Sequence, residues 1–188
     1  MRISARADYA VRAAIELAAL GAALGTAPAD RPGTGPAVES AAGPGGWTKA
    51  ERVADAQAIP LPFLLNIFKS LRDAGLVEAK RGTDGGHRLA LPAAQISVAA
   101  VVRAVDGPLA SVAGVLVEDL AYTGNAVALR DTWVALRCSI RSVLEAVTLA
   151  DLAAQQLPTT VLDLLGGADA FTTRPQAREH FQRRVDPA

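Results

Sequence analysis

The feature that most constrains the fold is a run of local signals between residues 48 and 91. Thr48 is followed three residues later by Glu51, the spacing of a helix N-cap with a capping box, so we expect a short helix there. A turn near Ile59 separates it from a longer amphipathic stretch, PLPFLLNIFKSLRDAGLV. Gly75 ends that stretch at the position where glycine commonly caps a helix, so a second helix is expected before it.

Two short extended runs, LVEAKR and HRLAL, follow the second helix and are separated by GTDGG. Asp-Gly-Gly between such runs is a strong hairpin signal, because glycine accepts the backbone angles that a tight turn requires. Short helix, turn, longer helix and hairpin is the order of a winged helix-turn-helix. The sequence therefore predicts a mainly α-helical chain with a small β-hairpin wing.

A further helix is expected over residues 5–20, with Ser4 as its N-cap and alanines at helical spacing. Residues 21–47 hold seven Gly and four Pro among mostly small residues, a composition that cannot bury enough apolar surface to order itself. We therefore predict a winged DNA-binding region over residues 1–92, interrupted by a flexible insertion at 21–47.

The distribution of charge agrees with this division. The 188 residues balance 19 basic against 19 acidic side chains, so net charge alone does not indicate a nucleic-acid partner. Residues 48–92, however, hold seven basic and five acidic side chains, whereas residues 93–188 hold eight basic and ten acidic ones. The positive charge therefore lies with the predicted helix-turn-helix.

A third part of the chain carries a helix with a coiled-coil-like pattern. After a helix expected over 97–105, apolar residues recur at steps of four and three: Leu129, Trp133, Leu136, Ile140, Val143 and Val147. We favour a dimer interface along this long helix over packing within its own domain. Residues 93–165 are thus expected to hold a linker helix and the dimerisation helices, and 166–188 a loose tail.

Candidate DNA contacts lie on two elements. The start of the longer helix would enter the major groove with Pro62, Phe63, Leu65, Asn66 and Lys69. The amide of Asn66 suits an adenine edge, Lys69 suits a phosphate, and Leu65 or Phe63 suits a thymine methyl. The alternative is that Phe63 and Leu65 belong to the core and Asn66 is merely solvated.

The predicted hairpin is basic at its base and tip, where Lys80, Arg81, His87 and Arg88 lie. A glycine-rich tip with an arginine suits the minor groove, whose negative potential attracts guanidinium groups. An ordinary solvated hairpin is the alternative, and the preceding helix-turn-helix favours DNA contact over it. Arg2, Ser4 and Thr48 complete the set of candidate DNA contacts.

A resemblance to the Rrf2-type (BadM-type) family of winged-helix repressors is carried by RISARADYAVRAAIELA, IPLPFLLNIFKSLRDAGLVEAKRGTDGGHRLA, ISVAAVVRAVDG and ALRDTWVALRCSIRSVLEAVTLADL. The resemblance implies a homodimer that binds a palindromic operator in double-stranded DNA. It implies that Arg81 enters the minor groove and that residues 62–66 read bases. Some relatives carry an acidic residue at the position of Leu65, so the apolar side chain argues against the operators that they use.

Cluster-binding members of this family place three cysteines in the loop after AVDG. That loop here, GPLASVAGVLVEDLAYTGN, has neither Cys nor His, and Asp8 is expected to pair with Arg12, so we expect no cofactor and no metal. The single cysteine, Cys138, lies off the predicted seam near Arg137 and Arg141. We consider it inert or, alternatively, a redox residue. It has no base placed to make it a nucleophile, so an enzyme is not expected.

Two classes of function remain. The first is a cytoplasmic DNA-binding regulator, expected to act as a repressor, whose signal is a small molecule, a protein effector or oxidation of Cys138. The second is a winged-helix protein-interaction module that has lost specific DNA binding, for which Leu65, the neutral net charge and the insertion are the motivation. No segment offers the uncharged length of about 18 residues that a membrane span requires.

Overall fold

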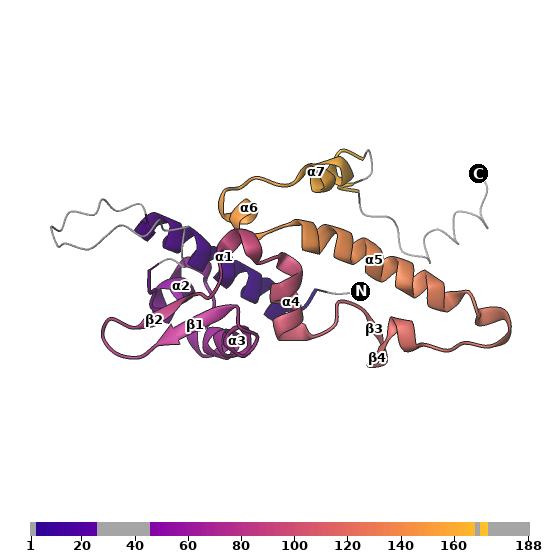
Figure 1. Ribbon diagram of the computed structural model, residues 1–188, viewed down its shortest axis with the longest axis horizontal. Helices are drawn as coiled ribbons and strands as arrows, with labels where there is room; N and C mark the ends of the chain where they lie inside the picture. The colour runs from indigo at the N-terminus through magenta and orange to yellow at the C-terminus, as the bar shows by residue number, and fades with distance from the viewer. Residues whose placement is uncertain (1–2, 26–45, 168–169, 173–188) are drawn as a thin grey trace, which may run out of the picture. The chain divides into compact units, whose positions relative to one another are not determined.

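A computed structural model describes residues 3–25, 46–167 and 170–172 (Figure 1). Residues 1–158 form one compact unit and residues 159–188 a second, whose described helix is α7 (Thr159–Leu165). The first unit contains α1 (Ala5–Gly25), α2 (Ala50–Gln57), α3 (Leu61–Asp73), β1 (Val77–Lys80), β2 (Gly86–Leu89), α4 (Val98–Asp106), β3 (Ser111–Val112), β4 (Val115–Leu116), α5 (Leu129–Ala146) and α6 (Leu149–Ala153). Short 3₁₀ turns lie at Ala93–Gln95, Val117–Asp119 and Gly124–Ala126. The predicted fold class, mainly α with a small β-hairpin wing, is confirmed.

Helix α1 is the central element of the first unit, in contact with α2, α3, α4 and α6. Its inner face is built from alanines, with Ala10 and Ala13 fully buried, so neighbouring backbones can approach closely. The Ser4 hydroxyl accepts a hydrogen bond from the backbone N–H of Ala7 at 2.9 Å, which confirms the predicted N-cap. The helix continues to Gly25, past its expected end at residue 20, because Ala-Ala-Leu at 22–24 favours helix. Residues 26–45 of the predicted insertion lie outside the described residues.

The expected capping box at Thr48 is wrong. Helix α2 begins at Ala50 after Lys49, and no side chain caps it. Thr48 is instead buried and pairs with His87 of the wing, whose carbonyl accepts from the Thr48 N–H at 2.9 Å and whose N–H donates to the Thr48 carbonyl at 2.7 Å. The segment before α2 thus adds a short bridge to the wing.

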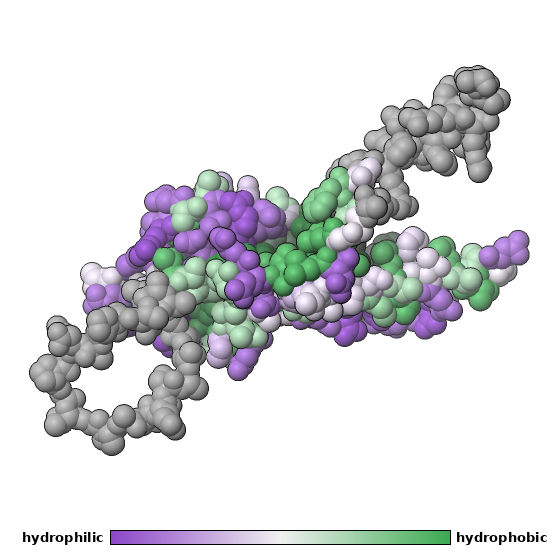
Figure 2. All heavy atoms as spheres, turned by 90° about the horizontal axis from the view of Figure 1, so that it is seen from above, coloured by the Kyte–Doolittle hydropathy of each residue, from purple (hydrophilic) through white to green (hydrophobic). Residues whose placement is uncertain are grey.

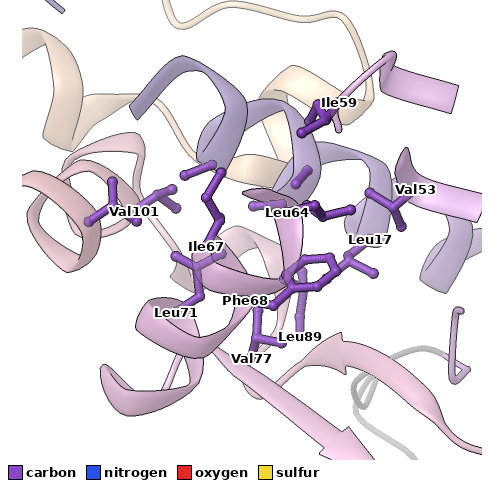
Figure 3. Close-up of a cluster of buried hydrophobic side chains, with 14 of the residues drawn as sticks. Leu17, Val53, Ile59, Leu64, Ile67, Phe68, Leu71, Val77, Leu89 and Val101 are labelled. Atoms are coloured by element: carbon purple, nitrogen blue, oxygen red, sulfur yellow. The ribbon is translucent and has the colours of Figure 1, made fainter. Parts of the chain in front are cut away.

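Helix α3 presents one buried face to the core. Leu64, Ile67, Phe68 and Leu71 lie inward and meet Val77 and Leu89 from the two strands of the wing (Figure 3). Gly75 has φ 72°, the left-handed conformation expected of a glycine that follows a helix. This shared core fixes the orientation of the wing relative to α3.

The wing is the predicted antiparallel hairpin. Val77 pairs with Leu89 and Lys80 with Gly86, so the turn spans residues 81–85. Helix α4 follows, with the Ser97 hydroxyl accepting from the Ala100 N–H at 3.2 Å as its N-cap. The loop after α4 forms a second small hairpin, β3–β4, that the sequence did not predict.

Helix α5 differs from the other long helices because none of its residues is buried. Its C-terminal end joins a backbone bridge in which the Val98 N–H donates to the Val147 carbonyl and the Leu149 N–H donates to the Ile96 carbonyl, both at 2.9 Å. Thr148 then caps α6 in a complete capping box with Asp151, and α6 ends at Ala153. Gln155 at φ 56° takes a conformation that a helix cannot continue.

Candidate nucleic-acid interface

The outward face of α3 carries the predicted base-reading residues. Pro62, Leu65, Asn66 and Lys69 are all exposed, and their spacing of three and four residues places them on one stripe of the helix, opposite the buried face. Phe63 lies between these surfaces: the residue is 39% exposed, and its ring packs edge-to-face with the Tyr9 ring, with the two centroids 5.6 Å apart. Four candidates thus share one solvent-facing surface, and Phe63 is packed at its border.

Two basic residues that the sequence interpretation omitted help to position this surface. Arg6 of α1 donates to the Ser70 hydroxyl of α3 at 2.7 Å, which ties the two helices together. Lys49 donates to the Gly82 carbonyl at 3.0 Å and so contacts the tip of the wing. Lys49 could have been chosen as a candidate from the sequence, because it is a basic residue next to the predicted start of the short helix.

The basic residues of the wing divide into two pairs. Lys80 and Arg81 are exposed where β1 runs into the turn, and within the described residues neither forms an ion pair. Arg88 is held on the sheet instead, since it donates to Glu78 at 2.8 Å and its guanidinium stacks 4.5 Å from the Trp47 ring centroid. The exposed positive charge of the wing therefore lies at Lys80 and Arg81.

The expected DNA contact of His87 is corrected by its packing. Its ring stacks on Phe68 with centroids 4.2 Å apart, and its Nδ1 is buried with no hydrogen-bond partner among the described residues. Neighbouring strand residues point to opposite faces, so His87 faces the core while Arg88 faces outward. Thr48 is corrected in the same way, because only 4% of it is exposed.

Acidification should destabilise the winged unit through His87. Burial lowers the pKa of His87 below its ordinary value of 6.5, the positive charge of Arg72 lowers it further, and Glu51 opposes both. The stability that the neutral His87 contributes is fully present above the pKa that this histidine has in the unfolded chain. It is lost as the pH falls toward the lower pKa of the folded protein, because the unfolded chain then binds a proton that the folded chain does not bind. Thermal unfolding at about pH 7.5 and about pH 5.5 should show a smaller drop for His87→Phe than for wild type.

The control for that measurement is His180→Asn, which removes the only other histidine of the chain and should keep the wild-type pH dependence. Equal pH dependence in His87→Phe and wild type would contradict the role given to His87.

The hydroxyl of Ser4 is engaged within the protein. Besides capping α1, it donates to Asp106 at 2.6 Å and so joins α1 to the end of α4. This double use makes Ser4 a residue that positions α1, and its contact with DNA stays a prediction. Arg2 lies outside the described residues.

A broad apolar groove lies beside α5. It is lined by residues of α1, α4, the β3–β4 loop and α5, including Val11, Val102, Leu109, Trp133, Leu136, Ile140 and Val143. Figure 2 shows apolar and polar residues interspersed over the surface of the described part of the chain. Leu129 and Leu136 are 37% and 42% exposed, whereas Val147 is buried in the protomer and therefore leaves the predicted seam. The remaining seam residues form an accessible apolar stripe.

Comparison with known proteins decides the family. The profile of Rrf2, described as an iron-dependent transcriptional regulator, matches residues 38–155. The chain belongs to the Rrf2 family. It is 42% identical over 186 residues to Rv1287 of Mycobacterium tuberculosis, named as an HTH-type transcriptional regulator, and the match covers 99% of this chain and all of that protein. CymR of Bacillus subtilis, an HTH-type transcriptional regulator, is 28% identical over 153 residues, which cover 81% of this chain and 90% of CymR.

Two solved structures show the same fold as this Rrf2 protein. The structure of CymR, the global cysteine regulator of B. subtilis, has a TM-score of 0.61 at 24% identity and covers 83% of this chain and 98% of its own. The structure of T. potens IscR has a TM-score of 0.58 at 24% identity and covers 82% of this chain and 88% of its own. The Rrf2 protein described here is thus a DNA-binding transcriptional regulator with a winged helix-turn-helix.

Within the described residues of this Rrf2 protein, no set of side chains matches the iron named in the family description. The loop over 107–125 contains no Cys or His, and Asp8 pairs with Arg12 at 3.4 Å as predicted. Across the described part of the chain, no three His, Cys, Asp or Glu side chains are placed to hold a metal ion. These residues do not fit an iron-sulfur cluster held by one chain. Cys138 is exposed on α5, and its redox role stays a prediction.

None of the described helices of this Rrf2 protein combines the length with the apolar character that crossing a membrane requires.

Proposed function

We propose that this Rrf2 regulator represses transcription in the cytoplasm as a homodimer bound to a palindromic operator. One observation carries the proposal: the exposed stripe of α3 and the exposed cations Lys80 and Arg81 are held in fixed relation by one core. A helix of this size fits the major groove, and a hairpin beside it reaches the adjacent minor groove. Residues 1–92 would then bind DNA and residues 93–165 would join the two copies.

The residues along the exposed stripe of α3 offer different kinds of contact to DNA. The amide of Asn66 can donate to and accept from an adenine edge, and the ammonium of Lys69 suits a phosphate. Pro62 and Leu65 offer apolar surface to thymine methyl groups, and the exposed edge of Phe63 lies beside them. This set favours an A·T-containing step at the centre of each half-site.

Replacing Arg81 with alanine should weaken operator binding by about 10- to 100-fold at matched salt, because a guanidinium would be lost from the minor groove. The operator is first isolated by selecting bound fragments of genomic DNA, and fluorescence anisotropy then measures affinity. Arg81→Lys is the matched variant, since it keeps the charge and loses the planar fork. Unchanged affinity in Arg81→Ala would remove the wing from the interface.

The proposed dimer uses the accessible stripe of α5, formed by Leu129, Trp133, Leu136, Ile140 and Val143. An 18-residue helix with no buried residue is unusual for a chain that folds alone, since helices gain most of their stability from packing. A second copy of α5 would cover this stripe.

A second candidate function is a winged-helix protein-interaction module without specific DNA binding. The exposed fractions of Leu65 and Phe63, 46% and 39%, favour it, because apolar side chains on α3 also suit a protein partner. The selection of genomic fragments separates the two candidates. A discrete inverted repeat supports the regulator, and the absence of any enriched site supports the interaction module.

A further inference from the structure

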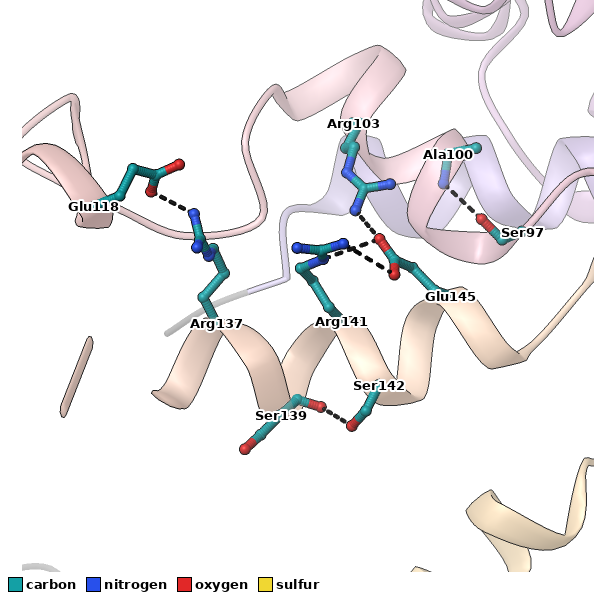
Figure 4. Close-up of polar contacts among 9 residues, drawn as sticks. All are labelled: Ser97, Ala100, Arg103, Glu118, Arg137, Ser139, Arg141, Ser142 and Glu145. Carbon is teal, nitrogen blue, oxygen red and sulfur yellow. Dashed lines mark hydrogen bonds and ion pairs between the residues drawn. The ribbon is translucent and has the colours of Figure 1, made fainter. Parts of the chain in front are cut away.

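A small pocket lies where α4, α5 and the loop between them meet. It measures about 180 Å³ and is lined by the guanidinium groups of Arg103, Arg137 and Arg141, by Glu118, and by Pro108, Leu109, Ala110 and Leu116. Figure 4 shows that Arg103 extends from α4, that Arg137 and Arg141 extend from α5, and that Glu118 comes from the loop. Three arginines from two helices therefore converge on one space.

The acidic residues around the pocket do not balance this charge. Glu145 accepts from Arg103 and from Arg141, the latter at 3.1 Å, and the Glu118 carboxylate accepts from Arg137. These hydrogen bonds hold the pKa of both glutamates below the ordinary value, so both are ionised near neutral pH. Two carboxylates thus face three guanidinium groups, and one positive charge is left over.

Arg137 provides an independent sign that an acceptor is missing. Its side chain is 22% exposed, yet its Nε is buried and makes no hydrogen bond within the described part of the chain. Buried donors in folded proteins are nearly always paired, and each arginine offers five N–H groups. The cluster around the pocket therefore contains one buried donor without an acceptor among the described residues, beside one excess positive charge.

The rest of the pocket lining is apolar, and it consists of Pro108, Leu109, Ala110 and Leu116. The volume equals the share of roughly six water molecules in the liquid, which is enough for a small organic molecule. A lining that combines apolar and cationic residues suits a ligand with a short hydrocarbon body and one anionic end.

We propose that this pocket binds a small aliphatic monocarboxylate as an effector. Its carboxylate accepts from the arginines, which match that group geometrically, and its hydrocarbon body lies on Leu109 and Leu116. Binding adds a link between α4, which contacts α1 and α3, and α5. The regulatory consequence rests on the function proposed above, whereas the binding itself does not.

Isothermal titration of the full-length protein tests the site. Isovalerate is the probe, and isovaleramide is its uncharged counterpart of nearly equal shape. Isovalerate should bind, and the amide should bind at least about tenfold more weakly because it cannot accept charge-assisted bonds from arginine. Arg137→Gln should weaken isovalerate by a similar factor, while Arg130→Gln should not, because Arg130 donates to the Glu118 backbone and does not line the pocket.

Leu116→Asp provides a second variant that leaves every ion pair of the cluster in place. Leu116 is 38% exposed, so the variant should fold, and its carboxylate should repel isovalerate. Equal binding of acid and amide, or binding that neither variant weakens, would overturn the proposal. Inorganic phosphate binding in preference to isovalerate would overturn the carboxylate class.

Operator affinity with and without isovalerate separates this inference from the proposed function. A change in affinity that Arg137→Gln removes supports an effector site, since ligand and DNA must influence each other reciprocally. Isovalerate binding with unchanged operator affinity overturns the regulatory part alone. If the protein binds isovalerate but selects no operator, the proposed function is contradicted, whereas the proposed carboxylate site is still supported.

Discussion

Replacing Leu136 with glutamate should separate the proposed dimer into monomers and abolish high-affinity operator binding. Leu136 is 42% exposed in the protomer, so the variant should fold, yet it lies at the middle of the apolar stripe of α5. An unpaired buried charge costs about 3–5 kcal/mol, and a symmetric interface receives two, so the dimer dissociation constant should rise at least about a hundredfold. A monomer reads one half-site and loses a factor of about 10²–10⁴ in avidity.

Sedimentation equilibrium would measure the oligomeric state, and anisotropy on the selected operator would measure binding. Ala135→Glu is the matched control: Ala135 is an exposed neighbour on the same helix, but it lies off the stripe, so the dimer should persist. A dimeric Leu136→Glu protein would show that the two copies, if they pair, use another surface.

Replacing Gly86 with alanine should detach the wing and lower the free energy of unfolding by about 2–4 kcal/mol. Gly86 has φ 153°, and a Cβ there would lie 2.4 Å from the Thr48 carbonyl oxygen. That contact is too short to relax locally, because the Thr48 oxygen belongs to the backbone and a Cβ is fixed to the backbone of its own residue, so the two hydrogen bonds between Thr48 and His87 must break. The displaced wing should also weaken operator binding, because Arg81 loses its position.

Gly75→Ala serves as the control for conformational strain without a clash. Gly75 also has a positive φ, 72°, but a Cβ there meets nothing within 4 Å, so its cost should be about 1 kcal/mol. Chemical denaturation compares the two variants. Equal losses of stability would mean that the approach of Thr48 does not fix the wing.

Local signals in the sequence were sufficient for most of the fold. The hairpin followed from Asp-Gly-Gly between extended runs, and the cap at Ser4 followed from residue type and spacing. The prediction of a helix cap at Thr48 was wrong because the backbone of Thr48 pairs with His87 in the wing, and no local sequence pattern indicates that pairing. The β3–β4 hairpin was missed because two-residue strands leave almost no periodic signal.

The sequence predicted which residues belong to the candidate interface better than it predicted the direction in which their side chains face. Alternation along a strand requires His87 and Arg88 to face opposite sides, but only the position of Phe68 shows which side is the core. Periodicity placed Val147 on the seam of α5, whereas the helix has already ended there and the side chain enters the protomer core. The pocket between α4 and α5 depends on loop geometry that the sequence does not encode locally.

The way α5 is attached makes it a lever. It spans about 27 Å, it is fixed at one end by the bridge between Ser97 and Thr148, and ion pairs rather than buried side chains hold it along its length. A rotation of about 5° at the bridge would displace its far end by roughly 2 Å. The proposed dimer sets the distance between the two copies of α3. A slight tilt of α5 at the bridge between residues 97 and 148 would therefore change that distance, so that it no longer matches the fixed spacing of the DNA half-sites.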